Sequence, residues 1–373
     1  MTKKYEVVYN YLRDYIEANK FTKNNKMPSE NFLCNKFNYS RETVRSAFSR
    51  LEKEGWIQTK RGSGSFFSIP LALLYSDEGK KNKKKVGLII QGQDINANLN
   101  LIEGIKTVLT EEAVTLRIML TGNQFSIERK WLNTITTDYD GLIVDGVKAS
   151  IMNPNLDCYT RIYNQNIRVI FYNNFYSESV FPKIIHNETL CADRLIEILK
   201  KNGHKNIAGI FVFDNYQGVE KYKGYISSII KYKLNFDDRY VKWIVSEELN
   251  NKKQLHKTIY KFLKTVPSCT AVMCANYMLY KILNDVISEM GKKIPDDYSV
   301  VCFDYSDTDW EEIGVTASIH PGYEMGKKIG QRMKMMLEDK NYKEKDYSYV
   351  FDPLIHEGKS VRNIASRHLK DKL

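Results

Sequence analysis

Residues 40–67, SRETVRSAFSRLEKEGWIQTKRGSGSFF, decide the fold of the N-terminal part of the chain. Their first half carries apolar residues at the spacing of one helix face: Val44, Ala47, Phe48 and Leu51. Ser40 is a suitable N-cap for this helix, and Gly55 is a suitable end. The second half has two short strand-like runs on either side of a glycine-rich turn. The stretch therefore predicts a helix followed directly by a β-hairpin.

Two further helices are predicted upstream of this stretch. The first covers residues 5–19 and has apolar side chains at helical spacing. The second begins after Pro28 with Ser29 as its N-cap. We expect this second helix to bury three residues: Phe32, Leu33 and Phe37. Residues 1–70 are thus predicted to form one compact unit of three helices and a hairpin.

The polar residues of this unit suit DNA. Arg41 lies in the first turn of the third helix, and a recognition helix enters the major groove with its N-terminal residues leading. An arginine there can donate two hydrogen bonds to guanine. Arg61 and Gly62 lie at the hairpin tip, where a cation and a close backbone approach suit a minor groove. Each feature alone also fits an ordinary surface helix or turn, but their combination favours a winged helix–turn–helix.

The unit resembles the winged helix–turn–helix of the GntR family. The resemblance rests on KMPSEN at 26–31, SRETVR at 40–45 and LEKEGWIQTKRGSGSFF at 51–67, which occur in the family's order. It implies DNA contacts by seven residues: Lys4, Glu30, Arg41, Thr43, Arg45, Arg61 and Gly62. Glu30 either accepts from a cytosine amino group or serves the helix dipole, and both readings stay open.

Charge and composition agree with a cytoplasmic nucleic-acid-binding protein. Of the net charge of +11, +6 falls on residues 1–70 and +3 on residues 71–85, which read as a linker. Positive charge at one end of a chain points to a polyanion. The chain has no apolar run of the ~20 residues that a membrane span needs, and its six cysteines have no zinc-site spacing. No membrane partner, metal or cofactor is expected.

From Val86 onward, short apolar runs alternate with segments of helix length. The runs are VGLII, LRIML, GLIVD, RVIFY, IAGIFVF, VKWIV, AVMCA and YSVVCFD. Such alternation predicts an α/β architecture with parallel strands. Two doubly wound subdomains, one large sheet and a barrel all fit the spacing of the runs.

Residues 86–361 resemble the effector-binding core of the LacI/GalR regulators, and residues 362–373 follow as a tail. The stretches that carry the resemblance are DGLIVDG, HNETLCADRLIEILKKNGHKNIAGI, QGVEKYKGY, AVMCANYML and IPDDYSVVCFDYSD. The resemblance implies two doubly wound parallel-sheet subdomains of the periplasmic-binding-protein type. It also implies an effector cleft lined by five residues: Asp94, Asn173, Lys221, Asn276 and Asp304. We expect Tyr172, Phe175 or Trp310 to stack on a sugar ring.

The core departs from its relatives at three positions of this cleft. Lys221 stands where the family has arginine, so a point charge replaces a planar fork. Tyr277 and Tyr305 stand where the family has aspartates. These departures leave the identity of the effector open among L-arabinose, another pentose and a polyol.

The two resemblances together imply a transcription regulator, and a repressor of carbohydrate-utilisation genes by default. We expect a homodimer that binds double-stranded operator DNA and leaves it when a sugar-like effector closes the cleft. No dinucleotide fingerprint, P-loop, HExxH or GxSxG motif occurs, so no enzymatic activity is expected. A sugar-binding module without DNA function and a sugar-processing enzyme are the alternatives. We further expect His186 near the cleft and a core or dimer stripe along the helix with Met325 and Met333.

Overall fold

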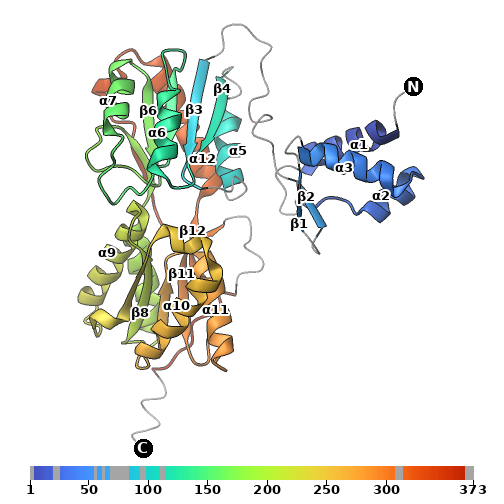
Figure 1. The fold of residues 1–373 in the computed structure, drawn as a ribbon. Helices are drawn as coiled ribbons and strands as arrows, with labels where there is room; N and C mark the ends of the chain where they lie inside the picture. The colour runs from blue at the N-terminus through green and yellow to red at the C-terminus, as the bar shows by residue number, and fades with distance from the viewer. Residues whose placement is uncertain are drawn as a thin grey trace, which may run out of the picture.

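The computed structural model in Figure 1 describes most of the chain. The described ranges are 4–19, 26–53, 57–60, 64–67, 84–92, 98–109, 114–306 and 314–365. Several predictions fall outside these ranges: the end of the third helix at Gly55, most of the linker, the last eight residues, and the site residues Arg61, Gly62, Asp94 and Trp310. Each helix within the described ranges is too short or too polar to cross a membrane.

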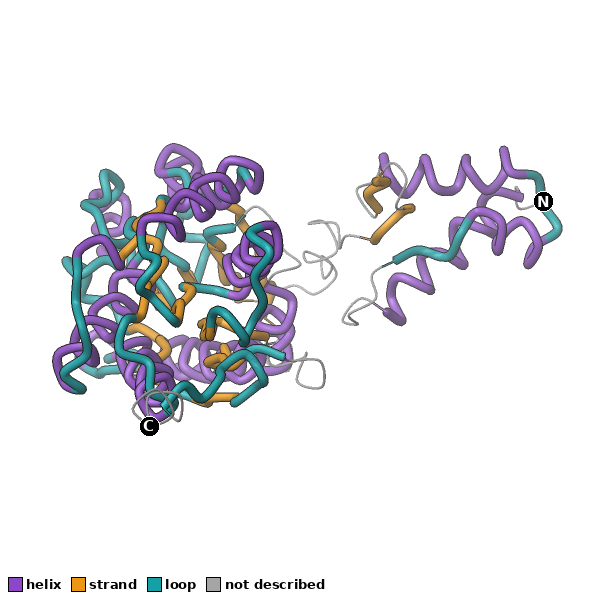
Figure 2. Tube along the Cα trace, turned by 90° about the horizontal axis from the view of Figure 1, so that it is seen from below, coloured by secondary structure: helices purple, strands orange, loops and turns teal. Residues whose placement is uncertain are grey.

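The N-terminal unit, here called the head, consists of three helices and a hairpin, as predicted. Its elements are α1 (Lys4–Asn19), α2 (Glu30–Phe37), α3 (Arg41–Lys53), β1 (Ile57–Lys60) and β2 (Gly64–Phe67). The predicted face of α3 is buried. Phe32, however, is 50% exposed, so its predicted burial is wrong. Because α2 has only eight residues, its narrow inner face is filled by Leu33, which is fully buried. The head helices group together, apart from the rest of the chain, in Figures 1 and 2.

The remainder forms two lobes, each built on one six-stranded sheet. In the N-lobe the order is β13-β7-β6-β5-β3-β4, and all neighbours are parallel. The strands are β3 (Lys84–Ile90), β4 (Val114–Leu120), β5 (Gly141–Val144), β6 (Arg168–Tyr172), β7 (Lys183–His186) and β13 (Tyr349–Phe351). The first strand thus begins at Lys84, two residues inside the predicted linker.

Helices cover both faces of the N-lobe sheet. One face packs against α5 (Leu99–Leu109) and α12 (Gly322–Glu338), and the other against α6 (Phe125–Asn133) and α7 (Leu156–Asn164). Successive residues of β3 point to opposite faces, which is why Leu88 packs with the first pair of helices and Ile89 with the second. Met325 and Met333 of α12 lie in this core, so the core alternative for the methionine stripe is confirmed.

The C-lobe sheet has the order β14-β12-β11-β10-β8-β9, and only its edge strand β14 runs antiparallel. The strands are β8 (Ile207–Val212), β9 (Val241–Ile244), β10 (Ala271–Cys274), β11 (Ser299–Ser306), β12 (Thr316–His320) and β14 (Leu354–His356). The helices are α8 (Glu188–Lys201), α9 (Tyr216–Lys231), α10 (Lys252–Thr265) and α11 (Tyr277–Glu289). Two doubly wound subdomains are therefore present, and the single-sheet and barrel alternatives are wrong.

The chain passes between the lobes three times. It leaves β7 for α8, leaves β12 for α12, and leaves β13 for β14 (Figure 1). The strands β7 and β12 both end where the chain enters the other lobe, at His186 and His320. The carboxyl ends of the strands in both sheets therefore face the gap between the lobes. Open α/β sheets bind ligands at this end of their strands.

Candidate functional site

The predicted DNA contacts of the head lie around the turn between α2 and α3. Ser40 caps α3 by accepting from the Thr43 N–H at 3.3 Å, and the two hydroxyl groups are 2.9 Å apart. The Lys4 ammonium lies 5.6 Å from the centre of the Tyr39 ring in the same turn. The start of α1 and the first turn of α3 therefore lie close together.

Two arginines of α3 contact α2. Arg41 donates to Asn31 Oδ1 at 3.1 Å, and Arg45 donates to Glu30 Oε2 at 3.0 Å. The Arg45 side chain is 66% exposed and the Glu30 side chain 39% exposed. Ion pairs this exposed contribute at most about 1 kcal/mol. DNA phosphates or bases can therefore replace Glu30 at little cost, and the unbound head holds both guanidinium groups in place.

The predicted effector residues Lys221 and Asp304 are in contact near the end of the C-lobe sheet that faces the N-lobe. Lys221 lies on α9 and is 3% exposed, and its Nζ contacts the Asp304 carboxylate directly and donates to Ala275 O at 3.1 Å. Burial lowers the pKa of Lys221, but the carboxylates of Asp304 and Glu188 outweigh this and hold it above its usual value. Burial likewise raises the pKa of Asp304, and the ammonium of Lys221 outweighs that, so its pKa is lowered. The two groups form a charged pair.

Two carboxylate oxygens beside this pair lack hydrogen bonds. Asp304 Oδ1 and Glu188 Oε2 are buried, and neither accepts a hydrogen bond from the part of the chain that the structure describes. A buried polar atom without a partner costs on the order of 1–3 kcal/mol. Hydroxyl groups of a bound polyol are the donors that such oxygens need. Glu188 was missed by the sequence analysis; the signal available was a carboxylate in HNETL, directly after an apolar run.

Asn173 and Asp304 both have left-handed backbone conformations, with φ of 51° and 56°. Such values are uncommon for residues other than glycine and collect at ligand sites. Asn173 directly follows β6, and its Oδ1 is hydrogen-bonded to His320 Nε2 at 3.2 Å. The structure thus connects this predicted effector residue to the crossover from β12 to α12.

Asn276 is the N-cap of α11, since its Oδ1 accepts from the Leu279 N–H at 2.9 Å. It follows Ala275, whose carbonyl accepts from Lys221, so it borders the same cleft. Of the predicted stacking residues, Tyr172 is fully buried, and Phe175 packs on Tyr216 with ring centroids 4.2 Å apart.

Comparisons with known proteins agree with both halves of this description. Residues 4–67 match the bacterial regulatory proteins of the gntR family, and residues 196–361 match the periplasmic binding protein-like domain. The chain is 30% identical over 334 residues to the arabinose metabolism transcriptional repressor of Halalkalibacterium halodurans, covering 87% of each chain. It is 28% identical over 342 residues to that of Geobacillus stearothermophilus, covering 91% of this chain and 92% of the relative.

The chain belongs to the family of the arabinose metabolism transcriptional repressors. The crystal structure of the transcription regulator CcpA of Lactococcus lactis shares the fold of the core. Its TM-score is 0.63 at 18% identity, over 75% of this chain and all of that one. The predictions of a GntR-type head, a LacI/GalR-type core and a DNA-binding repressor are confirmed.

A series of hydrogen bonds between four residues joins the two lobes of this repressor. Asp145 Oδ1 accepts from Asn174 Nδ2 at 2.9 Å, and Asn174 Oδ1 accepts from the Gln217 N–H at 3.3 Å. Gln217 Nε2 in turn donates to Glu188 Oε1 at 2.9 Å. Burial raises the pKa of Asp145 to about 7. Asp145 and Asn174 belong to the N-lobe, and Gln217 and Glu188 belong to the C-lobe, so these hydrogen bonds cross from one lobe to the other.

Further contacts join the lobes through side chains of the N-lobe. Asn123 Nδ2 donates to Ser246 Oγ, and Ser150 Oγ donates to Phe213 O. The Lys148 ammonium is paired with the Glu247 carboxylate. We call the Lys148–Glu247 and Asn123–Ser246 contacts the latch. The latch holds the lobes together in the conformation described.

Proposed function

We propose that this repressor binds operator DNA as a homodimer and releases it when a sugar-like effector occupies the cleft between the lobes. The effector part rests on two carboxylate oxygens, of Asp304 and Glu188. They have no hydrogen-bond donor among the described residues and lie beside the buried ammonium of Lys221. An ammonium and carboxylates together can accept from and donate to neighbouring hydroxyl groups. In this proposal the protein is cytoplasmic, because the operator DNA that it binds is in the cytoplasm.

L-Arabinose is the first effector to test, because both relatives are named as repressors of arabinose metabolism. Other pentoses and polyols present the same hydroxyl chemistry. In our proposal Asn173, Lys221, Asn276 and Asp304 contact the effector from both lobes, and Asp94 completes the set. Tyr277 and Tyr305 pack edge to face with ring centroids 4.5 Å apart, which supports a cleft wall that differs from one lined with aspartates.

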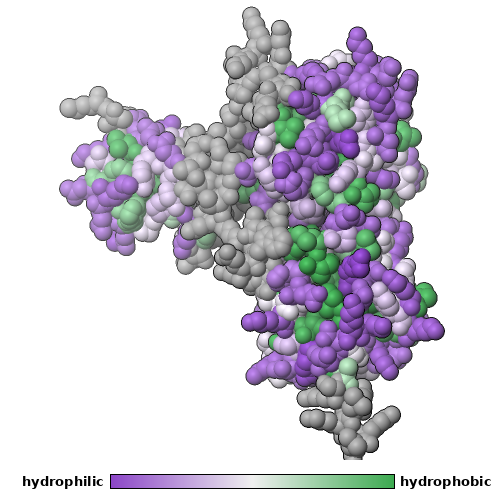
Figure 3. All heavy atoms as spheres, turned by 180° about the vertical axis from the view of Figure 1, so that it is seen from behind, coloured by the Kyte–Doolittle hydropathy of each residue, from purple (hydrophilic) through white to green (hydrophobic). Residues whose placement is uncertain are grey.

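Closure of the cleft is the proposed route from the effector to the DNA. The latch favours the closed conformation, and an effector that contacts both lobes favours it further. Complete switching from 1:99 to 99:1 requires about 5.5 kcal/mol of differential binding. In a homodimer, closure changes the spacing of the two heads and therefore their fit to two half-sites. Apolar side chains gather over the C-lobe and the middle of the molecule on the face in Figure 3, which supports association.

The DNA-binding part is tested by fluorescence polarisation with a palindromic promoter fragment. We expect Arg41→Ala to weaken specific binding by about 1–3 kcal/mol, because one base contact is lost. Lys4→Ala should weaken binding to all sequences and reduce the salt slope by about 1, because it removes one phosphate contact. The matched control is Arg194→Ala, an exposed arginine of the C-lobe paired with Glu197. Equal binding by Arg41→Ala and Arg194→Ala would contradict the proposed contact.

The effector part is tested by titrating the protein–DNA complex with L-arabinose, other pentoses and polyols. We expect one of them to release the DNA, and Asp304→Asn to abolish this release while DNA affinity stays unchanged. Asparagine tolerates the left-handed backbone but removes the charge that holds Lys221. Asp296→Asn on the exposed surface is the control. Loss of DNA binding in a folded Asp304→Asn protein would contradict the proposal that the head binds DNA and the core binds the effector.

A further inference from the structure

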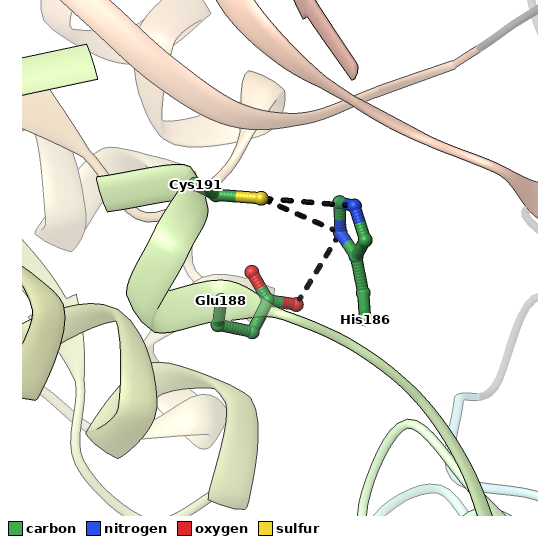
Figure 4. A group of neighbouring side chains, drawn as sticks. All are labelled: His186, Glu188 and Cys191. Atoms are coloured by element: carbon green, nitrogen blue, oxygen red, sulfur yellow. Dashed lines mark hydrogen bonds and ion pairs between the residues drawn. The ribbon is translucent and has the colours of Figure 1, made fainter. Parts of the chain in front are cut away.

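Three potential metal ligands lie together where the chain first enters the C-lobe. His186 is the last residue of β7, and Glu188 and Cys191 lie in the first turn of α8. Figure 4 shows the three side chains pointing toward one another. All three are buried, with ligand atoms within 4.8 Å of one another. Because they come from one six-residue segment, His-x-Glu-x-x-Cys, little chain entropy is lost in bringing them together.

The separations are close to those in a tetrahedral metal site. Cys191 Sγ lies 3.7 Å from His186 Nδ1 and 3.6 Å from Nε2. Metal bonds of about 2.3 Å to sulfur and about 2.0 Å to nitrogen place these ligands roughly 3.5 Å apart. Glu188 Oε1 lies 4.0 Å from His186 Nδ1 and must approach by several tenths of an ångström. Both ring nitrogens are nearly equidistant from the sulfur, so a turn of the imidazole brings either into place.

The charges of the cleft leave room for a cation. Lys221 is in direct contact with Asp304, and its Nζ lies 3.9 Å from Glu188 Oε2, beyond hydrogen-bonding distance. One ammonium therefore faces two buried carboxylates, and Glu188 Oε2 has no hydrogen-bond donor among the described residues. A buried carboxylate of this kind must either hold a proton or acquire a cation.

We propose that His186, Glu188 and Cys191 bind one divalent transition-metal ion, with Zn²⁺ as the best match to a nitrogen, an oxygen and a sulfur ligand. A fourth position remains for water or a hydroxyl group. Cys191 binds the ion as a thiolate, so its thiol proton is released on binding. Glu188 is shared with the proposed effector site, but metal binding requires neither DNA nor a sugar and therefore goes beyond the proposed function.

The groups around the site set its selectivity. The Lys221 ammonium repels a cation, but the Asp304 carboxylate in direct contact with it offsets its charge. The His320 ring lies 6.2 Å from the His186 ring and is hydrogen-bonded to Asn173. The protein is thus expected to favour ions that bind thiolate and imidazole strongly, and to ignore Mg²⁺ and Ca²⁺.

Cobalt substitution tests the proposal with the full-length protein, freed of metal and without sugar or DNA. We expect Co²⁺ at one equivalent to give a thiolate-to-cobalt charge-transfer band in the near ultraviolet and visible bands of four-coordinate cobalt, and Zn²⁺ to remove both. Cys191→Ser should abolish the charge-transfer band, and Glu188→Gln should weaken Co²⁺ binding. The matched control is Cys34→Ser in the head, because Cys34 is the one of the six free thiols that is not buried.

The absence of the band, or its loss in Cys34→Ser and not in Cys191→Ser, would overturn the proposal. X-ray absorption spectroscopy of the zinc-loaded, unmutated protein identifies the atoms bound to zinc. This measurement does not depend on whether a variant folds. One sulfur neighbour together with nitrogen and oxygen neighbours supports the site. A shell without sulfur, or no zinc retained after gel filtration, refutes it.

Discussion

At the scale of single residues, the replacement of a guanidinium by an ammonium shapes the cleft. Lys221 makes three polar contacts: with Asp304, with Ala275 O, and at longer range with Glu188. An ammonium can contact these three groups one by one, whereas a planar fork pairs best with a single carboxylate through two parallel bonds. The compact ammonium leaves one oxygen on each of two carboxylates for a ligand. In our proposal, these oxygens accept hydrogen bonds from hydroxyl groups of the effector.

Asp145 makes a pH dependence of stability testable. Burial raises its pKa from the ordinary 3.8 to about 7, so across this range the folded protein keeps a proton that the unfolded chain releases. The unfolded state then binds fewer protons, and stability falls as pH rises through this window. We expect Asp145→Asn to reduce this fall by up to about 1.4 kcal/mol per pH unit. Urea denaturation of both proteins at several pH values measures it.

The control for this experiment is Asp296→Asn, which changes an exposed carboxylate. Identical pH slopes for Asp145→Asn and the unmutated protein would mean that Asp145 stays ionised in the fold.

At the scale of elements, the N-lobe depends on a close crossing of α5 and α12. A Cβ atom on Gly104 would lie 2.2 Å from the carbonyl oxygen of Tyr323, and one on Gly326 would lie 2.1 Å from that of Leu101. These distances are far below van der Waals contact, and the obstacles are backbone atoms. The two glycines therefore allow the backbones of α5 and α12, which are far apart in the sequence, to come into contact.

Gly104→Ala should separate these helices. We expect a loss of about 1–3 kcal/mol in unfolding free energy, because the packed backbones must move apart. Gly322→Ala at the start of α12 is the control, since its Cβ would lie 3.5 Å from the nearest atom, the Cβ of Asn100. Thermal and urea denaturation compare the three proteins. Equal destabilisation by the two substitutions would contradict a special role for the crossing.

At the scale of the whole molecule, three crossovers and the latch join the two lobes. His186 and His320 mark two of the crossovers, and their rings are 6.2 Å apart. The series of hydrogen bonds from Asp145 to Glu188 runs between the lobes beside them. In our proposal, closure therefore involves Glu188, one of the two carboxylates that face the effector.

Lys148→Met should loosen closure without touching the effector. Because the Lys148–Glu247 pair joins the two lobes, its loss should weaken sugar binding about two- to fivefold while DNA affinity without sugar stays unchanged. Isothermal titration calorimetry measures the sugar affinity. Lys201→Met removes a comparable pair, with Glu197, that lies within α8 and should have no effect. An unchanged sugar affinity in Lys148→Met would show that the Lys148–Glu247 pair does not contribute to closure.

Local patterns were sufficient for most of the fold. All eight strands predicted in the core are present, and the apolar faces of the head helices pack as expected except at Phe32. The motif resemblance also led to Lys221 and Asp304, which the structure brings into contact. Four core strands were not predicted: β7, β12, β13 and β14. They have three to five residues each, too few for a periodicity to be seen.

The sequence by itself determined the helices and hairpin of the head, the buried strands and the family, because each depends on the order of residues within a short segment. Only the tertiary structure decided that Glu188 joins Lys221 and that His186 faces His320, residues 33 and 134 positions apart along the chain. The physical reason is that neither contact is local. Glu188 meets Lys221 where α8 packs on α9 within the C-lobe, and His186 meets His320 where the chain crosses between the lobes. No spacing within a short segment encodes such contacts.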